Sequence, residues 1–166
     1  MSIVRRPEPR VVIPTPPGAS SPGARAVMRG NRRRDTRAEL ALRSALHAMG
    51  LRYRLDLKIG PGRSAPRPDV VFPRARVAVF VDGCFWHGCP EHGVKPRTNS
   101  DYWRAKLARN EQRDASNDTR LSELGWQVVR VWEHEDPQAA ARRISGAVQQ
   151  RTNGPVPSGA AARITY

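Results

Sequence analysis

The 166-residue sequence predicts one α/β domain in which a central mixed β-sheet is flanked by helices. Three observations support this prediction: short apolar runs bounded by turn residues, helical segments with cap residues at their ends, and the order in which the two kinds alternate. That order is helix, three strands, long helix, strand and helix. Elements in this order can bury their apolar faces against one shared sheet.

Cap and stop residues bound the helical segments. Thr36 and Glu39 have the spacing of a capping box, and Gly50 offers a stop. Asp136 and Pro137 give an N-cap followed by proline in the first helical position. We expect helices over 36–49, 100–124 and 137–149.

Four short segments have the character of strands, and they are 51–57, 69–72, 77–82 and 126–133. The first, LRYRLDL, alternates apolar and basic residues as a half-buried strand does. The third, VAVFVD, is nearly all apolar, which is typical of a buried strand. The tight turn between the second and third predicts an antiparallel pair.

The charge of the chain is strongly positive, with 29 Lys and Arg against 15 Asp and Glu, a formal net charge of +14. Such a surplus favours a polyanionic partner, with nucleic acid ahead of an anionic membrane surface. No stretch approaches the ~20 apolar residues of a spanning helix, and no signal-peptide core is visible, so we expect a cytoplasmic, nucleoid-associated protein. Composition predicts a disordered basic arm over 1–27, a domain over 28–152 and a flexible tail over 153–166.

Two aspartates lie at the ends of neighbouring predicted strands. Asp69 begins one strand and Asp82 ends the next, so an antiparallel hairpin brings their carboxylates together. Paired acids of this kind can hold Mg²⁺, which polarises a phosphate and activates water. Glu39 on the first helix could add a third carboxylate through a water molecule. The alternative is that both aspartates only cap strand ends.

The stretch VDGCFWHGCPEHG at 81–93 gathers both cysteines of the chain. In a reducing compartment close cysteines favour metal binding over a disulfide. The spacing fits a structural zinc site, and five side chains compete for its four positions: Cys84, His87, Cys89, His92 and His134. Aromatic residues accompany this stretch. We expect Tyr102 to pack under the loop, and Phe85, Trp86 and Trp103 either pack there too or face outward as a wedge between base pairs.

The run RPDVVFPRARVAVFVDGCFWHGC at 67–89 resembles the very short patch repair (Vsr) DNA mismatch endonucleases. Further matching stretches are MRGNRRRDTRAE at 28–39, TNSDYWRAKLARNEQRD at 98–114 and LGWQVVRVWEHE at 124–135. The resemblance implies a restriction-endonuclease-like fold. It also implies Mg²⁺-dependent nicking of one DNA strand on the 5′ side of the mispaired thymine in a T:G mismatch, the product of 5-methylcytosine deamination.

The resemblance assigns roles position by position. Asp69 matches a Mg²⁺-binding aspartate, His87 a catalytic histidine that acts through water, and Glu39 an acid near the active site. The aromatics that match residues inserted into DNA are Phe85, Trp86 and Trp103. With His87 in catalysis, the zinc ligands are Cys84, Cys89, His92 and His134.

Some positions depart from one well-known form of the family. Val81-Asp82 replaces Thr-His, so the second Mg²⁺ contact is either the Val81 carbonyl or Asp82. His92 replaces a zinc histidine that in that form lies between the two cysteines, and His134 replaces a cysteine. Zinc accepts such exchanges of nitrogen for sulfur.

The long charged helix is expected to follow DNA phosphates through Arg104, Lys106, Arg109 and Arg113, unless these residues only form a solvated face. Three functions remain open: a T:G mismatch-nicking repair enzyme, a related nuclease with another trigger such as restriction or modified DNA, and a zinc-stabilised DNA-binding protein without catalysis. Since one nick requires one active site, we expect a monomer.

Overall fold

The computed structural model describes residues 11–16, 18, 34–93 and 96–154. The predicted C-terminal tail lies outside the described residues from 155 onward, and so does most of the predicted N-terminal arm. The described part of that arm, residues 11–16 and 18, has no regular secondary structure. Within the described ranges, no helix is long and apolar enough to cross a membrane.

A three-stranded mixed sheet forms the centre of the domain, as predicted. Its strands are β1 (Val70–Phe72), β2 (Val77–Asp82) and β3 (Gln127–Trp132), in the order β1-β2-β3. β1 and β2 pair antiparallel, with Val70 opposite Val79, and β2 and β3 pair parallel. The carboxyl ends of β2 and β3 therefore lie side by side, and the start of β1 lies at the same edge of the sheet.

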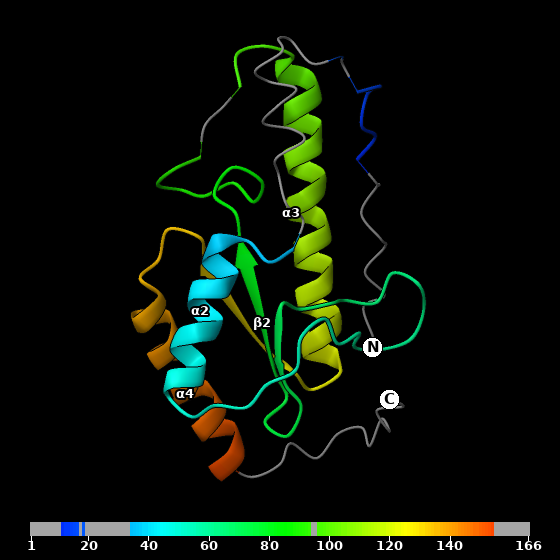
Figure 1. Cartoon of the computed structure of the whole chain (residues 1–166). Helices are drawn as coiled ribbons and strands as arrows, with labels where there is room; N and C mark the ends of the chain where they lie inside the picture. Colours follow the sequence, from blue (N-terminus) through cyan, green and yellow to red (C-terminus); the bar gives the residue numbers. More distant parts are fainter. Residues whose placement is uncertain (1–10, 17, 19–33, 94–95, 155–166) are drawn as a thin grey trace.

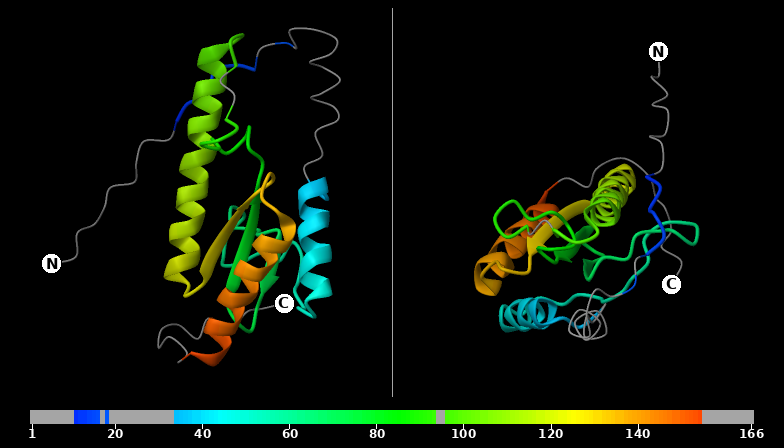
Figure 2. Two further views of the ribbon diagram at one scale, coloured as in Figure 1. Left: turned by 90° about the vertical axis from the view of Figure 1, so that its left-hand side faces the viewer. Right: turned by 90° about the horizontal axis from the view of Figure 1, so that it is seen from above.

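Three helices cover the sheet: α2 (Arg37–Ala48), α3 (Ser100–Glu123) and α4 (Pro137–Asn153). α2 and α4 lie together on one face, and α3 crosses the other (Figures 1 and 2). The predicted caps are confirmed, because Thr36 accepts a hydrogen bond from the Glu39 amide and Asp136 accepts one from the Ala139 amide. The last helix is one turn longer than predicted.

The apolar residues of β1 and β2 divide between two cores, as alternating strand geometry requires. One core lies between the sheet and the α2/α4 pair, and its largest fully buried members are Leu42, Leu46, Val70, Val77, Val79 and Ile144. The other lies between the sheet and α3, and it contains Ile59, Val71, Ala78, Leu121 and Trp126. Because helices cover both faces of the sheet, nearly every residue of β2 is apolar.

The predicted strand over 51–57 is wrong. This segment makes a single bridge, in which Arg54 and Val71 exchange two backbone hydrogen bonds of 2.8 Å. A strand would place alternate residues on one face, but Tyr53 packs on the α2/α4 side and Leu57 on the α3 side. The crossing occurs at Asp56, whose φ of 52° breaks the extended backbone. The alternating apolar residues of 51–57 therefore contact two different cores, and they do not form one face of a strand.

Candidate active site

A cleft of about 1140 Å³ opens between α2, the carboxyl end of β2 and α3. Most of the residues singled out in the sequence line it: Glu39, Asp69, Val81, Asp82, Trp86, His87, Trp103, Lys106 and Arg113. They come from two helices, two strand ends and the loop after β2. Three of the other candidates are absent from its walls: Phe85, Arg104 and Arg109.

Asp69 lies at the entrance to β1, where its carboxylate replaces a backbone acceptor of the sheet. Its Oδ2 atom accepts a 2.7 Å hydrogen bond from the Val81 amide. Burial raises the pKa of Asp69 to about 6; the negative charges of Glu39 and Asp82 add to the shift, and the Val81 hydrogen bond opposes it. The cleft therefore concentrates negative charge around Asp69, as a cation-binding site does.

Glu39 is buried at the start of α2 and belongs to the cap of that helix. Its Oε1 atom accepts from the Thr36 hydroxyl at 3.0 Å, and its Oε2 atom accepts from the Asp35 amide at 3.0 Å. Arg43 contacts Oε2 at 2.8 Å. Burial alone would lower the pKa of Arg43, but its hydrogen bonds and charge pairing with Asp35 and Glu39 raise that pKa. Glu39 faces the cleft with both oxygens engaged.

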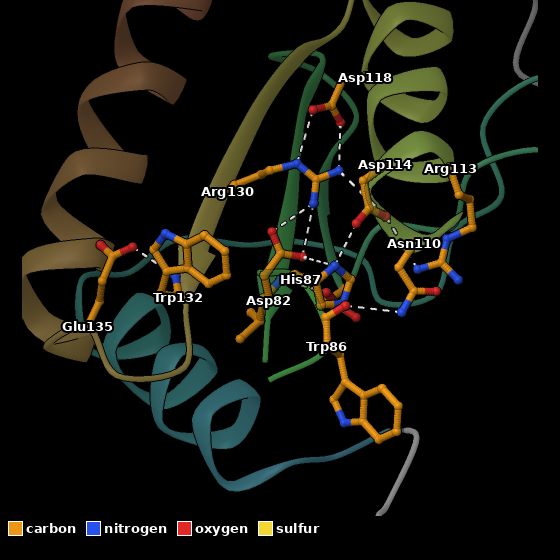
Figure 3. Close-up of polar contacts among 12 residues, drawn as sticks. Asp82, Trp86, His87, Asn110, Arg113, Asp114, Asp118, Arg130, Trp132 and Glu135 are labelled. Atoms are coloured by element: carbon orange, nitrogen blue, oxygen red, sulfur yellow. Dashed lines mark hydrogen bonds and ion pairs between the residues drawn. The ribbon is translucent and has the colours of Figure 1, made fainter. Parts of the chain in front are cut away.

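Asp82 ends β2 and is held by an arginine of the neighbouring strand. Arg130 donates from Nη1 to both oxygens of Asp82, at 2.9 and 2.7 Å. Its other edge donates to Asp118 of α3 at 3.0 and 2.9 Å (Figure 3). Burial opposes the charge of Arg130, but the two carboxylates outweigh it and raise the pKa of the guanidinium.

His87 points into this acidic network, as Figure 3 shows. Its Nδ1 atom lies 2.6 Å from Oδ2 of Asp114 and 3.5 Å from Oδ1 of Asp82. Burial works to raise the pKa of Asp114, but His87, Arg113 and Arg130 lower it below its usual range. An ionised Asp114 orients the imidazole and leaves Nε2 as the atom for proton transfer.

Sequence reasoning missed Asp114, Asp118 and Arg130. Two signals were available: the aspartates lie four residues apart on one side of a helix, and Arg130 interrupts the largely apolar run WQVVRVW. A charged residue inside a strand is rarely buried without a partner. Sequence spacing could not identify the partner, because Asp82 lies 48 positions away.

The Cys/His cluster, defined as Cys84, Cys89, His92 and His134, lies beside the cleft at the other end of the same loop. Its four ligand atoms all lie within 4.8 Å of one another. Sγ of Cys84 lies 3.0 Å from Nδ1 of His134, and Sγ of Cys89 lies 3.7 Å from the same atom. Tetrahedral zinc with thiolate and imidazole ligands separates neighbouring ligand atoms by about 3.5 Å. The four side chains thus form a group able to hold a metal ion.

Two glycines allow the loop to close around these side chains. Gly88 has a φ of 67°, a conformation that L side chains rarely adopt. A Cβ atom at Gly93 would lie 2.5 Å from the Cys89 carbonyl oxygen. Burial raises the pKa of the Cys84 thiol to about 11, with Cys89 and Glu133 adding to the shift. Metal binding at this group therefore displaces protons.

An aromatic cluster, defined as Phe85, Trp86, Tyr102 and Trp103, stands at the mouth of the cleft. Phe85 packs edge-on against Trp86 at 4.9 Å and against Trp103 at 5.2 Å. The three rings are only partly buried, and Trp86 and Trp103 line the cleft itself. Asn110 donates to the Trp86 carbonyl at 3.0 Å, which ties the loop to α3. The cluster is therefore a partly exposed apolar surface at the cleft.

The cations of α3 divide between two sides of the helix. At 100° per residue, Lys106, Arg109 and Arg113 fall within about 60° of one another and Arg104 lies on the opposite side. Lys106 lies over the Trp86 ring at 5.1 Å, and Arg113 is 57% exposed at the rim of the cleft. Arg104 is 77% exposed and pairs with Asp101 at 3.2 Å.

Comparison with known proteins identifies relatives that share most of the chain. Residues 21–92 match the family described as DNA mismatch endonuclease Vsr. Type II nicking enzyme V.NaeI of Lentzea aerocolonigenes is 46% identical over 142 residues, covering 84% of this chain and 85% of the relative. Type II nicking enzyme V.XorIIP of Xanthomonas oryzae is 43% identical over 115 residues, covering 67% and 79%.

The DNA mismatch endonuclease Vsr of Escherichia coli strain K12 is 40% identical over 107 residues, covering 64% of this chain and 66% of that protein. The family match at residues 21–92 includes Glu39, Asp69, Asp82 and His87 of the cleft and three of the four members of the Cys/His cluster. The acidic cleft, the oriented histidine and the relatives all agree with hydrolysis of DNA. The chain belongs to the Vsr family and is a DNA endonuclease.

Proposed function

We propose that the protein nicks one strand of double-stranded DNA on the 5′ side of the mispaired thymine in a T:G mismatch, and so initiates very short patch repair. One observation carries the proposal: the same cleft joins the Asp69 carboxylate and His87 to a partly exposed aromatic surface. The Asp69 carboxylate and His87 could serve an endonuclease that hydrolyses fully paired DNA. One that selects a weakened base pair also needs a surface that can replace a stacked neighbour.

The cleft suits Mg²⁺ because its donors are oxygen atoms with excess negative charge. Asp69 is the first ligand we propose, together with either the Val81 carbonyl or Asp82, and Glu39 contributes through water. Bound by these residues, Mg²⁺ would stabilise the charge that develops on the scissile phosphate and would lower the pKa of a water molecule beside it. Glu39 and Asp82 line the same cleft as Asp69, and a bound cation would offset the negative charge of these three carboxylates.

His87 serves proton transfer in this proposal. Asp114 and Asp82 hold its Nδ1 side, so its Nε2 side can take a proton from the attacking water or give one to the leaving oxygen through water. The restriction-endonuclease-like fold implied by the family supplies the sheet edge on which these groups meet. A single nick requires one such site, so we propose a monomer that acts in the cytoplasm, associated with the nucleoid.

Zinc is the metal that we propose for the Cys/His cluster. Two thiols and two imidazoles are a donor set of structural zinc, and no fifth protein ligand is needed. The cluster immobilises the loop that carries both His87 and Trp86. A short irregular segment can then present a catalytic group and an apolar wedge with a fixed geometry between them.

Binding to DNA rests on the net charge of +14 and on the arrangement of α3. Phe85, Trp86 and Trp103 are proposed to enter the base stack beside the mismatch. Phosphate contacts are proposed for Lys106, Arg109 and Arg113, which share one side of α3, with Arg104 making a weaker contact from the other side.

A second candidate is a nicking enzyme of the same chemistry that responds to another trigger, such as a restriction site or a modified base. The relatives named type II nicking enzymes favour it, V.NaeI among them at 46% identity. The active site would be the same in both cases, and only the recognised DNA would differ.

A strand-resolved nicking assay separates these candidates. End-labelled duplexes carry T:G, T:A or C:G at one position in varied flanking sequence, and each is incubated with Mg²⁺ beside the Asp69→Ala variant. We expect a nick just 5′ of the mispaired thymine, absent from matched duplexes and from the variant. Equal cleavage of all duplexes would support the second candidate, and binding without cleavage would contradict both.

A further inference from the structure

We infer that Arg130 is a positioning residue of the cleft, and that it commits Asp82 to orienting His87 instead of to binding the metal ion. The inference rests on the proposed function and narrows it. Of the two alternatives for the second Mg²⁺ contact, it leaves the Val81 carbonyl.

Both oxygens of Asp82 are already engaged by an arginine. Both of its oxygens accept hydrogen bonds from Nη1 of Arg130, at 2.9 and 2.7 Å, and the side chain is only 5% exposed. A direct Mg²⁺ ligand must direct a lone pair at the ion in a near-octahedral shell. Arg130 also balances the charge of Asp82, and its own positive charge would repel a nearby cation.

Asp69 differs from Asp82 in each of these respects. Only its Oδ2 atom has a hydrogen-bond donor within the described part of the chain, the Val81 amide. In an extended strand the N–H and C=O of one residue point to the same side, so the Val81 carbonyl is directed toward Asp69 as well. A carboxylate oxygen and a backbone carbonyl thus meet on the side of the cleft away from Arg130.

Arg130 also joins three elements with one guanidinium. It extends from β3, binds Asp82 of β2, and binds Asp118 of α3 at 2.9 and 3.0 Å. Its plane lies over the Phe80 ring at 5.0 Å. Figure 3 shows the guanidinium between these acids, with Asp114 one helical turn from Asp118. The planar fork fixes the distance of α3 from the sheet more tightly than a point charge could.

The contacts of Arg130 determine how His87 is oriented. The imidazole is held between Asp114 of α3 and Asp82 of β2, at 2.6 and 3.5 Å from its Nδ1 atom. Both carboxylates take their positions from Arg130, which binds Asp82 and lies 3.9 Å from Asp114. Arg130 does not reach the reacting atoms, and it acts through the orientation of His87.

Cation binding without DNA tests the assignment of Asp82. The full-length protein, Asp69→Asn and Asp82→Asn are titrated with Mn²⁺ in a calorimeter, because Mn²⁺ uses the same oxygen ligands as Mg²⁺. We expect Asp69→Asn to lose about tenfold or more in affinity and Asp82→Asn to stay within about twofold. An equal loss in the two variants would overturn the inference.

Kinetics and stability together test the positioning role. Arg130→Lys keeps the charge and loses the fork, so we expect the single-turnover nicking rate to fall about 10- to 100-fold with the DNA dissociation constant within about twofold. The matched control Arg142→Lys changes an exposed arginine of α4 and should leave both values unchanged. An unaltered rate in Arg130→Lys would contradict the inference.

A double variant separates positioning from mere stability. Asp82→Asn with Arg130→Gln removes both charges of the pair, so its Tm should exceed that of Arg130→Gln alone. We expect the nicking rate to stay low although stability recovers, and a rate that recovers with the Tm would refute the positioning role. If the wild-type protein nicked no duplex with Mg²⁺, the proposed function would fail, but the Mn²⁺ titration would still decide the role of Asp82.

Discussion

The Cys/His cluster and the acidic cleft begin at the same short loop, but the chain assembles them in different ways. Three of the four cluster ligands lie within residues 84–92, and one comes from the end of β3. The cleft draws Asp69, Asp82, His87, Asp114 and Arg130 from two strand ends, the loop, α3 and the interior of β3. A metal can organise residues that are near in sequence, whereas the cleft requires the sheet and α3 to be in place first.

Because the two regions are assembled differently, we expect mutations in them to have different effects on stability and activity. A change in the cleft removes a charge or a hydrogen bond from an intact scaffold. A change in the cluster releases the loop, and with it both His87 and Trp86. Stability and activity should therefore separate in the cleft and fall together in the cluster.

The largest expected effect is that of Asp69→Ala, which should lower the single-turnover nicking rate at least ~10³-fold. The variant loses the carboxylate that we propose to hold Mg²⁺, while the core residues around β1 stay in place. Rate is measured on a mismatched duplex, and folding by thermal denaturation. If Asp69→Ala were inactive only because it unfolds, the result would contradict the expectation that activity and stability separate in the cleft.

The next effect is that of His134→Ala, which takes one ligand from the Cys/His cluster. We expect bound zinc to fall from one per chain to substoichiometric levels, the Tm to drop, and the nicking rate to fall roughly 100-fold. Metal content is measured by elemental analysis of the purified protein. His47→Ala is the control, since His47 is exposed on α2. Full activity in metal-free protein would show that the loop does not need its cluster.

Asp114→Asn should act on the cleft alone. Losing the charge that faces Nδ1 of His87 at 2.6 Å should slow nicking about 10- to 100-fold. DNA affinity and zinc content should remain unchanged, as measured by fluorescence anisotropy and elemental analysis. Asp101→Asn, at an 84% exposed side chain of the same helix, is the matched control. A loss of zinc in Asp114→Asn would mean that the two regions are coupled more tightly than their geometry indicates.

Asp69→Asn should make the folded protein more stable while abolishing activity. Burial raises the folded-state pKa of Asp69 from 3.8 to about 6, so between these values the folded chain holds a proton that the unfolded chain releases. The free energy of unfolding of the wild type therefore falls as pH rises through this window. Without Mg²⁺ at pH 7, the variant should gain about 1–2 kcal/mol.

Chemical denaturation from pH 4 to 7 measures this difference. The wild type should regain stability when Mg²⁺ is added, and the variant should not. A wild-type stability that rises through the window would contradict the assigned direction of the pKa shift.

The smallest effect concerns the outer surface of α3. Arg113→Ala should weaken DNA binding about three- to fivefold and reduce the salt dependence by about one phosphate contact. Arg104→Ala should have a smaller effect on both values, because Arg104 lies on the far side of the helix and pairs with Asp101. DNA-binding isotherms at several salt concentrations measure both values for the two variants. Equal effects would show that DNA contacts α3 more broadly than the cleft side.

The sequence alone determined most elements of the fold and, through the family resemblance that assigned His87 to catalysis, the four members of the Cys/His cluster. Caps such as Thr36 and the apolar run of β2 are local signals, and ligand spacing in a short loop is local too. The exception was 51–57, where alternation predicted a strand but the residues divide between two cores. Propensity cannot reveal that division, since it depends on which neighbours cover each face.

Only the tertiary structure decided the network of the cleft. Asp82 looked like a free ligand until β3 placed Arg130 against both of its oxygens, and Asp114 had no evident role until α3 placed it beside His87. The physical reason is that a buried charge takes its function from its partners, and these partners lie on separate elements. Sequence spacing shows which charges exist, and packing determines which of them remain available to bind a metal ion or move a proton.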